Sequence, residues 1–87
     1  MERIIGSSNF KVYVQVTALF RENGNLVPLS FVWEDGRRYT IDKIKDVRPA
    51  PSLRAGGAGM RYTCMVQGRQ TYLFREEDRW FMERRGN

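Results

Sequence analysis

The dipeptides Asn23-Gly24 and Asp35-Gly36 constrain this fold most, because each lies between runs of alternating apolar residues. Asn-Gly and Asp-Gly pairs in that setting are the strongest short-range signal for a β-hairpin. A two-residue type I′ turn at Asn23-Gly24 predicts the cross-strand pairs Phe20 with Val27, Ala18 with Leu29, Val16 with Phe31, and Val14 with Trp33. Every pair is apolar on both sides, so the first hairpin is expected to bury one face.

The second hairpin allows two loop lengths. A two-residue loop would place Tyr39 and Ile41 on the face that points away from Phe31. A three-residue loop with Gly36 in the left-handed conformation instead pairs Phe31 with Tyr39 and Leu29 with Ile41. Only the three-residue loop keeps a single core face, so we predict it.

After this hairpin the apolar spacing changes. Ile41, Ile44 and Val47 are three apart, which predicts a β-bulge near Asp42-Lys43, with a turn of helix as the alternative. Residues 48–59 are rich in Pro and Gly and are expected to form an internal loop between two β-meanders.

The second meander is expected to span residues 60–67, 70–75 and 79–84. Its tight turn at Gly68 fits type I′ with Gln67 or type II′ with Arg69, and both keep the same residues on each face. Residues 79–84 are predicted to be an outer strand that could add a strand from a partner. The chain is therefore expected to be a single all-β domain, residues 1–87, built as a small, strongly bent antiparallel barrel or roll of about six strands, SH3-like or OB-like in size.

The amino-acid composition excludes several kinds of catalytic and metal-binding site. The chain has no histidine and one cysteine, Cys64, which excludes a disulfide within the chain and the common zinc sites. Cys64 alternates with Tyr62 and Val66, which is typical of a buried, unreactive thiol. Carboxylates gather mostly at predicted turns, where they are common without catalysis. We therefore expect no enzymatic activity, no cofactor and no metal.

No apolar run reaches the length of a membrane span, and the first residues lack the pattern of a signal peptide. The expected setting is cytoplasmic, with no membrane partner. The net charge is +5, and residues 48–87 carry eight arginines against four acidic residues. A basic half of this kind favours nucleic acid, an anionic lipid or an acidic protein as the partner.

The candidate binding residues lie on the second face of the second meander. Alternation places Tyr72, Phe74 and Phe81 there together with Arg61 and Arg79. Aromatic rings flanked by arginines suit single-stranded nucleic acid, because bases stack on the rings while guanidinium groups hold phosphates. Arg54 in the internal loop is a further candidate for phosphate contact.

Two other interpretations of the same residues stay open. The aromatic side chains could be the far side of a barrel core, with the arginines extended towards solvent. The face could also be buried against a partner strand or a second copy, which would make the chain a protein-protein interaction or structural domain. A small enzyme would need a desolvated carboxylate such as Asp42 or Glu83 in a pocket, and Trp33 and Trp80 are expected to anchor the core.

The chain also resembles a group of short bacterial β-domains of unknown function. The resemblance rests on Pro28, Phe31 and Trp33, on DGRRYTID (residues 35–42), on RYTC (61–64) and on TYLFREEDRWFMER (71–84). Some similar domains are encoded beside, or fused to, lesion-bypass DNA polymerases, so the resemblance implies a role linked to DNA. It implies no particular functional residue.

Overall fold

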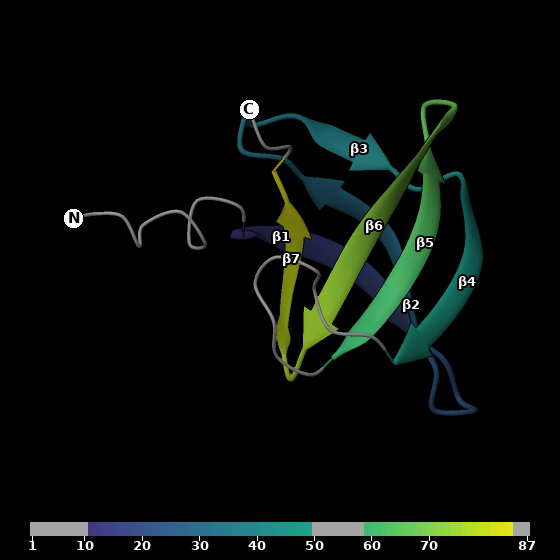
Figure 1. Ribbon diagram of the computed structural model, residues 1–87. Helices are drawn as coiled ribbons and strands as arrows, with labels where there is room; N and C mark the ends of the chain where they lie inside the picture. Colours follow the sequence, from purple (N-terminus) through teal and green to yellow (C-terminus); the bar gives the residue numbers. More distant parts are fainter. Residues whose placement is uncertain (1–10, 50–58, 85–87) are drawn as a thin grey trace.

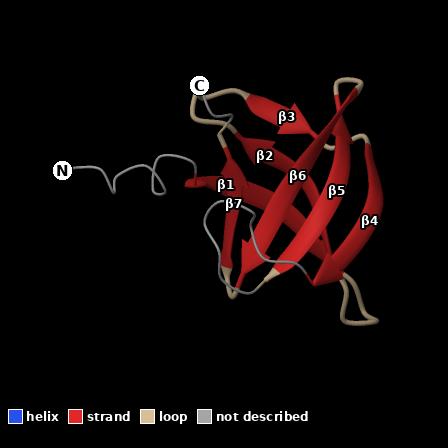
Figure 2. Cartoon of the chain, in the orientation of Figure 1, coloured by secondary structure: helices blue, strands red, loops and turns tan. Residues whose placement is uncertain are grey.

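The structure is a computed structural model that describes residues 11–49 and 59–84. These residues form one antiparallel sheet in the order β3-β2-β1-β7-β6-β5-β4, curled into a half-barrel, and contain no helix (Figures 1 and 2). The strands are β1 (Lys11–Phe20), β2 (Leu26–Val32), β3 (Arg38–Thr40), β4 (Lys43–Pro49), β5 (Met60–Val66), β6 (Arg69–Glu76) and β7 (Arg79–Glu83). The expected all-β fold is confirmed.

The β1–β2 hairpin corrects the predicted turn. Arg21 N donates to Asn25 O at 2.8 Å, and Gly24 has a φ of 92°, so the loop has three residues instead of two. A bulge at Leu29 compensates, because Thr17 pairs with Ser30 while Ala18 pairs with Pro28. The predicted pairing of Val16 with Phe31 is therefore present.

Three expectations for this hairpin are wrong. Leu29 is 44% exposed because the bulge takes it out of the alternation. Phe20 pairs with Leu26 and is 74% exposed, since the hairpin end projects beyond the rest of the sheet (Figure 1). Val14 pairs with Trp80 of β7, because β1 changes partner from β7 to β2 along its length.

The three-residue loop of the second hairpin is confirmed. Gly36 has a φ of 84°, and Phe31 pairs with Tyr39. Ile41 N donates to Leu29 O at 2.9 Å, which continues that register.

The strand expected after the second turn, which carries Tyr39, Ile41, Ile44 and Val47, is divided in two. At Ile41-Asp42 the chain leaves the β3 edge of the sheet and crosses to the other edge, where Asp42 N donates to Met65 O at 2.9 Å. Because this corner divides one expected strand, the sheet has seven strands where six were expected. The bulge lies between Ile44 and Asp46 instead of near Asp42-Lys43, because the corner itself absorbs the break in alternation there.

The last strand is not at the sheet edge. β7 lies between β1 and β6, because the first half of β1 pairs with it, and the edges are β3 and β4. The prediction of an outer strand at residues 79–84 is therefore wrong. β4 extends to Pro49, so the first two residues of the expected loop are strand. The remainder, which includes Arg54, lies outside the described residues.

The core lies on the concave side of the sheet. The faces expected for the second meander are confirmed here, since Tyr62, Cys64 and Leu73 are all at most 4% exposed. Trp33 and Trp80 pack against this core while staying partly exposed. Cys64 is completely buried, and this burial raises its thiol pKa to about 11, which keeps it protonated and unreactive at neutral pH. None of the described segments forms a helix suited to crossing a membrane.

Candidate binding face on the outer side of the sheet

Strand pairing places a row of cationic and aromatic residues across the convex side of the sheet. Each member of the row is the direct partner of the next on the neighbouring strand. From β4 to β1 the row runs Arg48, Arg61, Phe74, Phe81 and Tyr13. Directly opposed residues on one face of a sheet are close enough to contact one another. We call this row, together with its neighbours Lys11, Tyr72 and Arg79, the outer face.

The aromatic rings of the outer face divide into a buried pair and an exposed pair. Phe74 and Phe81 stack with ring centroids 5.1 Å apart, and both are only 3% exposed. Tyr13 meets Phe81 edge to face at 5.9 Å, and Tyr72 lies 6.5 Å from Phe74. The two tyrosines are 43% and 38% exposed, so they present the accessible rings while the phenylalanines hold them in place.

Two arginines lie over these exposed rings. The Arg79 guanidinium carbon is 3.6 Å from the centroid of the Tyr13 ring, and that of Arg61 is 4.8 Å from the centroid of the Tyr72 ring. Within the described residues neither guanidinium forms an ion pair or hydrogen bond with a carboxylate, although the Arg61 charge contributes to the lowered pKa of Asp46. Arg61 Nε is also buried without a hydrogen bond. Because ring contacts leave the positive charge uncancelled, both arginines keep their attraction for anions.

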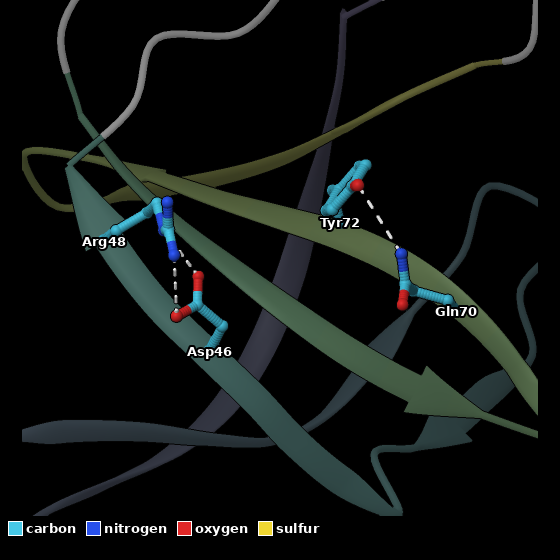
Figure 3. A network of polar contacts seen from close by, with 4 residues as sticks. All are labelled: Asp46, Arg48, Gln70 and Tyr72. Atoms are coloured by element: carbon cyan, nitrogen blue, oxygen red, sulfur yellow. Dashed lines mark hydrogen bonds and ion pairs between the residues drawn. The ribbon is translucent and has the colours of Figure 1, made fainter.

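The other two cations of the outer face are paired. Lys11 lies 4.5 Å from the centroid of the Phe81 ring and donates to Glu76 at 3.0 Å, and this hydrogen bond is the main reason that its pKa is raised. Arg48 pairs with Asp46 at 2.7 Å, and its hydrogen bond lowers the pKa of that carboxyl (Figure 3). Arg61 and Arg79 are therefore the cations most available to a ligand.

A surface hollow adjoins the pair formed by Arg79 and Tyr13. It has a volume of about 380 Å³ and lies where β1 leaves β7, with Gln15, Asp78 and Trp80 among its lining residues. On the other side of the outer face, Gln70 Nε2 donates to the hydroxyl of Tyr72 at 3.5 Å (Figure 3). The exposed rings are thus bordered by polar groups that can contact a bound polar ligand.

The structure brings together five of the six candidate binding residues. Arg61, Tyr72, Phe74, Arg79 and Phe81 all belong to the outer face, and Arg54 lies outside the described residues. Phe74 and Phe81 are only 3% exposed, so of the three rings expected to stack on bases only that of Tyr72 is accessible.

The sequence reasoning missed Tyr13 and Lys11. They belong to a strand far away along the chain, which pairs with β7 only in the folded sheet. Their odd positions in β1, opposite the apolar even positions, were the available signal.

Several carboxylates of the described residues accept hydrogen bonds that join separate parts of the fold. Glu34 accepts two hydrogen bonds from Arg84, at 2.8 and 3.1 Å, and Asp42 accepts one from Gln67 N at 3.1 Å. Residues 11–49 and 59–84 contain no group of three side chains that could hold a metal ion. The arrangement of the outer face fits binding by stacking and charge.

Comparison with protein families, curated proteins and solved structures finds no match to this chain. The resemblance of residues 28–84 to short bacterial β-domains therefore stays a prediction.

Proposed function

We propose that this chain is a non-enzymatic binding module that takes single-stranded nucleic acid on its outer face. The observation that carries the proposal is the position of Arg61 and Arg79, each over an exposed tyrosine ring and neither in an ion pair or hydrogen bond with a carboxylate of the described residues. A cation held on a partly exposed aromatic ring is the combination that a nucleotide needs, because it offers a phosphate contact beside a stacking surface.

Each tyrosine-arginine pair would bind one nucleotide. Guanidinium planes stack on bases as aromatic rings do, so a base can lie against either member of the pair. The guanidinium N–H groups stay available to donate to a phosphate in the plane of the group. Phe74 and Phe81, stacked and buried between the two pairs, would keep them at a fixed separation.

Single strands are favoured over duplexes by the same geometry. Stacking on Tyr13 and Tyr72 needs unpaired bases whose faces are accessible. The described residues form no helix, which is the element that most often reads the major groove of a duplex. The expected sequence preference is weak, because every base offers a face for stacking.

A protein-protein interaction or structural domain is the second candidate, and exposed apolar side chains at one end of the sheet favour it. Phe20 is 74% exposed and Val47 is 45% exposed. The two functions differ in their response to salt. Phosphate contacts weaken steeply with ionic strength, whereas an apolar interface changes little.

The test is a titration of isotopically labelled protein with a short mixed-sequence single-stranded oligonucleotide, at low and moderate salt. We expect saturable backbone amide shifts around Tyr13, Arg61, Tyr72 and Arg79, which weaken as salt is added. Absence of shifts at low salt would contradict the proposal.

A pair of charge-matched variants makes the test specific. Arg61→Gln with Arg79→Gln removes two charges from the outer face, and Arg21→Gln with Arg37→Gln removes two from hairpin loops. We expect the first double variant to lose most of the binding and the second to keep it. Equal losses would show that only the overall charge matters.

A further inference from the structure

The concave side of the half-barrel has a separate cavity at one open end. Its volume is about 580 Å³, and it lies between the β1–β2 hairpin and strands β4, β5 and β6. Apolar side chains from three strands line it, among them Leu26, Ile44, Val47 and Met60. The hydroxyl of Tyr62 donates to Leu26 O at 3.0 Å and ties the hairpin to the opposite wall.

This cavity is open because the sheet does not close between β2 and β4. β3 pairs only with Ser30, Phe31 and Val32, so among the described strands none pairs with the beginning of β2 on that side. Neither the open part of β2 nor the outer side of β4 suits an added strand. Pro28 lacks an N–H group, and β4 carries the bulge between Ile44 and Asp46 and ends at Pro49. The opening is thus better suited to a small molecule than to the backbone of a partner.

The described residues that line the cavity carry charge of one sign, since they include Arg75 and Arg21 and no acidic side chain. Arg75 donates from Nη1 to Glu77 O at 3.0 Å, but its Nε is buried without a hydrogen-bond partner, and no carboxylate of the described residues pairs with it. The Arg75 guanidinium carbon lies 6.0 Å from the centroid of the Trp80 ring, a contact that leaves its positive charge in place, so an anion in the cavity would have a cation to pair with.

We propose that this cavity binds a small carboxylate with an apolar body, of the fatty-acid type. The hydrocarbon would lie against Ile44, Val47 and Met60, and the carboxylate would contact Arg75. The volume lies in the range of about 300–1,000 Å³ usual for small-molecule sites, which are mostly apolar with few polar groups. The cavity is on the opposite side of the sheet from the outer face, so this site is independent of nucleic-acid binding.

The test uses decanoate as the probe and decanol, which has the same chain without the charge, as its control. Methyl shifts of Leu26, Val27, Ile44, Val47 and Met60 in labelled protein report on the cavity. We expect saturable shifts at these methyl groups, with decanoate bound about tenfold more tightly than decanol, the ratio typical of one charged hydrogen bond. Equal affinities would overturn the proposed role of the cation, and backbone amide shifts confined to Tyr13 and Tyr72, with the cavity methyl groups unshifted, would overturn the location.

Two variants on β6 distinguish a specific effect of Arg75 on decanoate binding from a general effect of positive charge. Arg75→Gln removes the cation of the cavity that lies on β6, and Arg69→Gln removes an exposed cation at the other end of the same strand. Arg75→Gln should lower decanoate affinity about tenfold and leave decanol affinity unchanged, as expected for the loss of one charged hydrogen bond. Arg69→Gln should change neither. An equal effect of both variants would contradict the proposal.

Val47→Glu gives a test that does not depend on Arg75 and its packing. Val47 is 45% exposed at the cavity, so a carboxylate there can reach solvent without unfolding the sheet. The variant should weaken decanoate more than decanol, through repulsion between like charges. Undiminished decanoate binding would overturn the site. The single-stranded oligonucleotide should leave the cavity methyl groups unshifted whether or not it binds the outer face.

Discussion

Gln67 occupies a backbone conformation that suits its side chain poorly. Its φ is 51° and that of Gly68 is 78°, which makes the β5–β6 turn type I′ and decides between the two turn types that the sequence allowed. The left-handed region costs most residues about 1–2 kcal/mol, but asparagine tolerates it. We expect Gln67→Asn to stabilise the fold by about 0.5–1 kcal/mol, seen as a higher melting temperature in circular dichroism. Gly68→Ala should have the opposite effect, and a lower melting temperature for Gln67→Asn would contradict the turn assignment.

Tyr72 and Phe74 lie near each other on β6 and should respond very differently to truncation. Phe74 is 3% exposed and stacks on Phe81, whereas Tyr72 is 38% exposed. Phe74→Ala should cost about 3–5 kcal/mol of unfolding free energy, the usual loss for a buried aromatic ring. Tyr72→Ala should cost about 1 kcal/mol or less, because much of its ring already contacts water. Urea unfolding of the two variants measures the difference, and similar losses would show that the outer face is packed otherwise.

At the level of the element, the β2–β3 turn is held by a carboxylate. Asp35 accepts hydrogen bonds from Arg37 N and from the Tyr39 hydroxyl, each at 2.9 Å, and the backbone bond is the main reason that its pKa is lowered. A lowered folded-state pKa gives stability that is complete above the ordinary carboxyl pKa and is lost as the pH falls through the folded value.

We therefore expect Asp35→Asn to lose less stability than the wild-type chain between about pH 5 and pH 2, the range in which carboxyl groups titrate. Its amide oxygen can still accept from Arg37 N, so the turn should be kept. The comparison is made by urea unfolding at each pH. An unchanged acid slope would mean that this hydrogen bond does not contribute to the pH dependence, and Glu34 and Asp46, whose pKa values are also lowered by arginines, would account for it.

Each hairpin shows how far local sequence determines an element. The pairing of Phe31 with Tyr39 could be predicted because only one loop length keeps a single apolar face. The bulge at Leu29 could not, because a three-residue loop followed by a bulge gives the same pairing of Val16 with Phe31 as a two-residue loop without one. Apolar pairing determines which residues share a face but leaves the turn geometry undetermined.

The candidate site could also be predicted only as far as local turns determine strand pairing. Arg61, Tyr72 and Phe81 could be placed on one face, since the turns of the second meander determine their alternation. Tyr13 could not be added, because its pairing with Phe81 joins opposite ends of the chain and no turn specifies it. The joining of the two halves of the sheet through β1 and β7 is a property of the whole molecule, because it brings together the residues that bury the concave face.

For the whole molecule, the question is whether binding depends on the net charge of +5 or on two particular cations. Salt dependence separates these, because the slope of log affinity against log salt counts the phosphates that are directly neutralised, at about 0.7 per contact for single strands. Arg61→Gln with Arg79→Gln should reduce the slope by about 1.4, the sum for two such contacts. Arg21→Gln with Arg37→Gln lowers the net charge equally and should leave the slope unchanged. Affinities measured by fluorescence anisotropy at several salt concentrations give both slopes, and a shared reduction would mean that the oligonucleotide is held by the field of the whole protein instead of by the outer face.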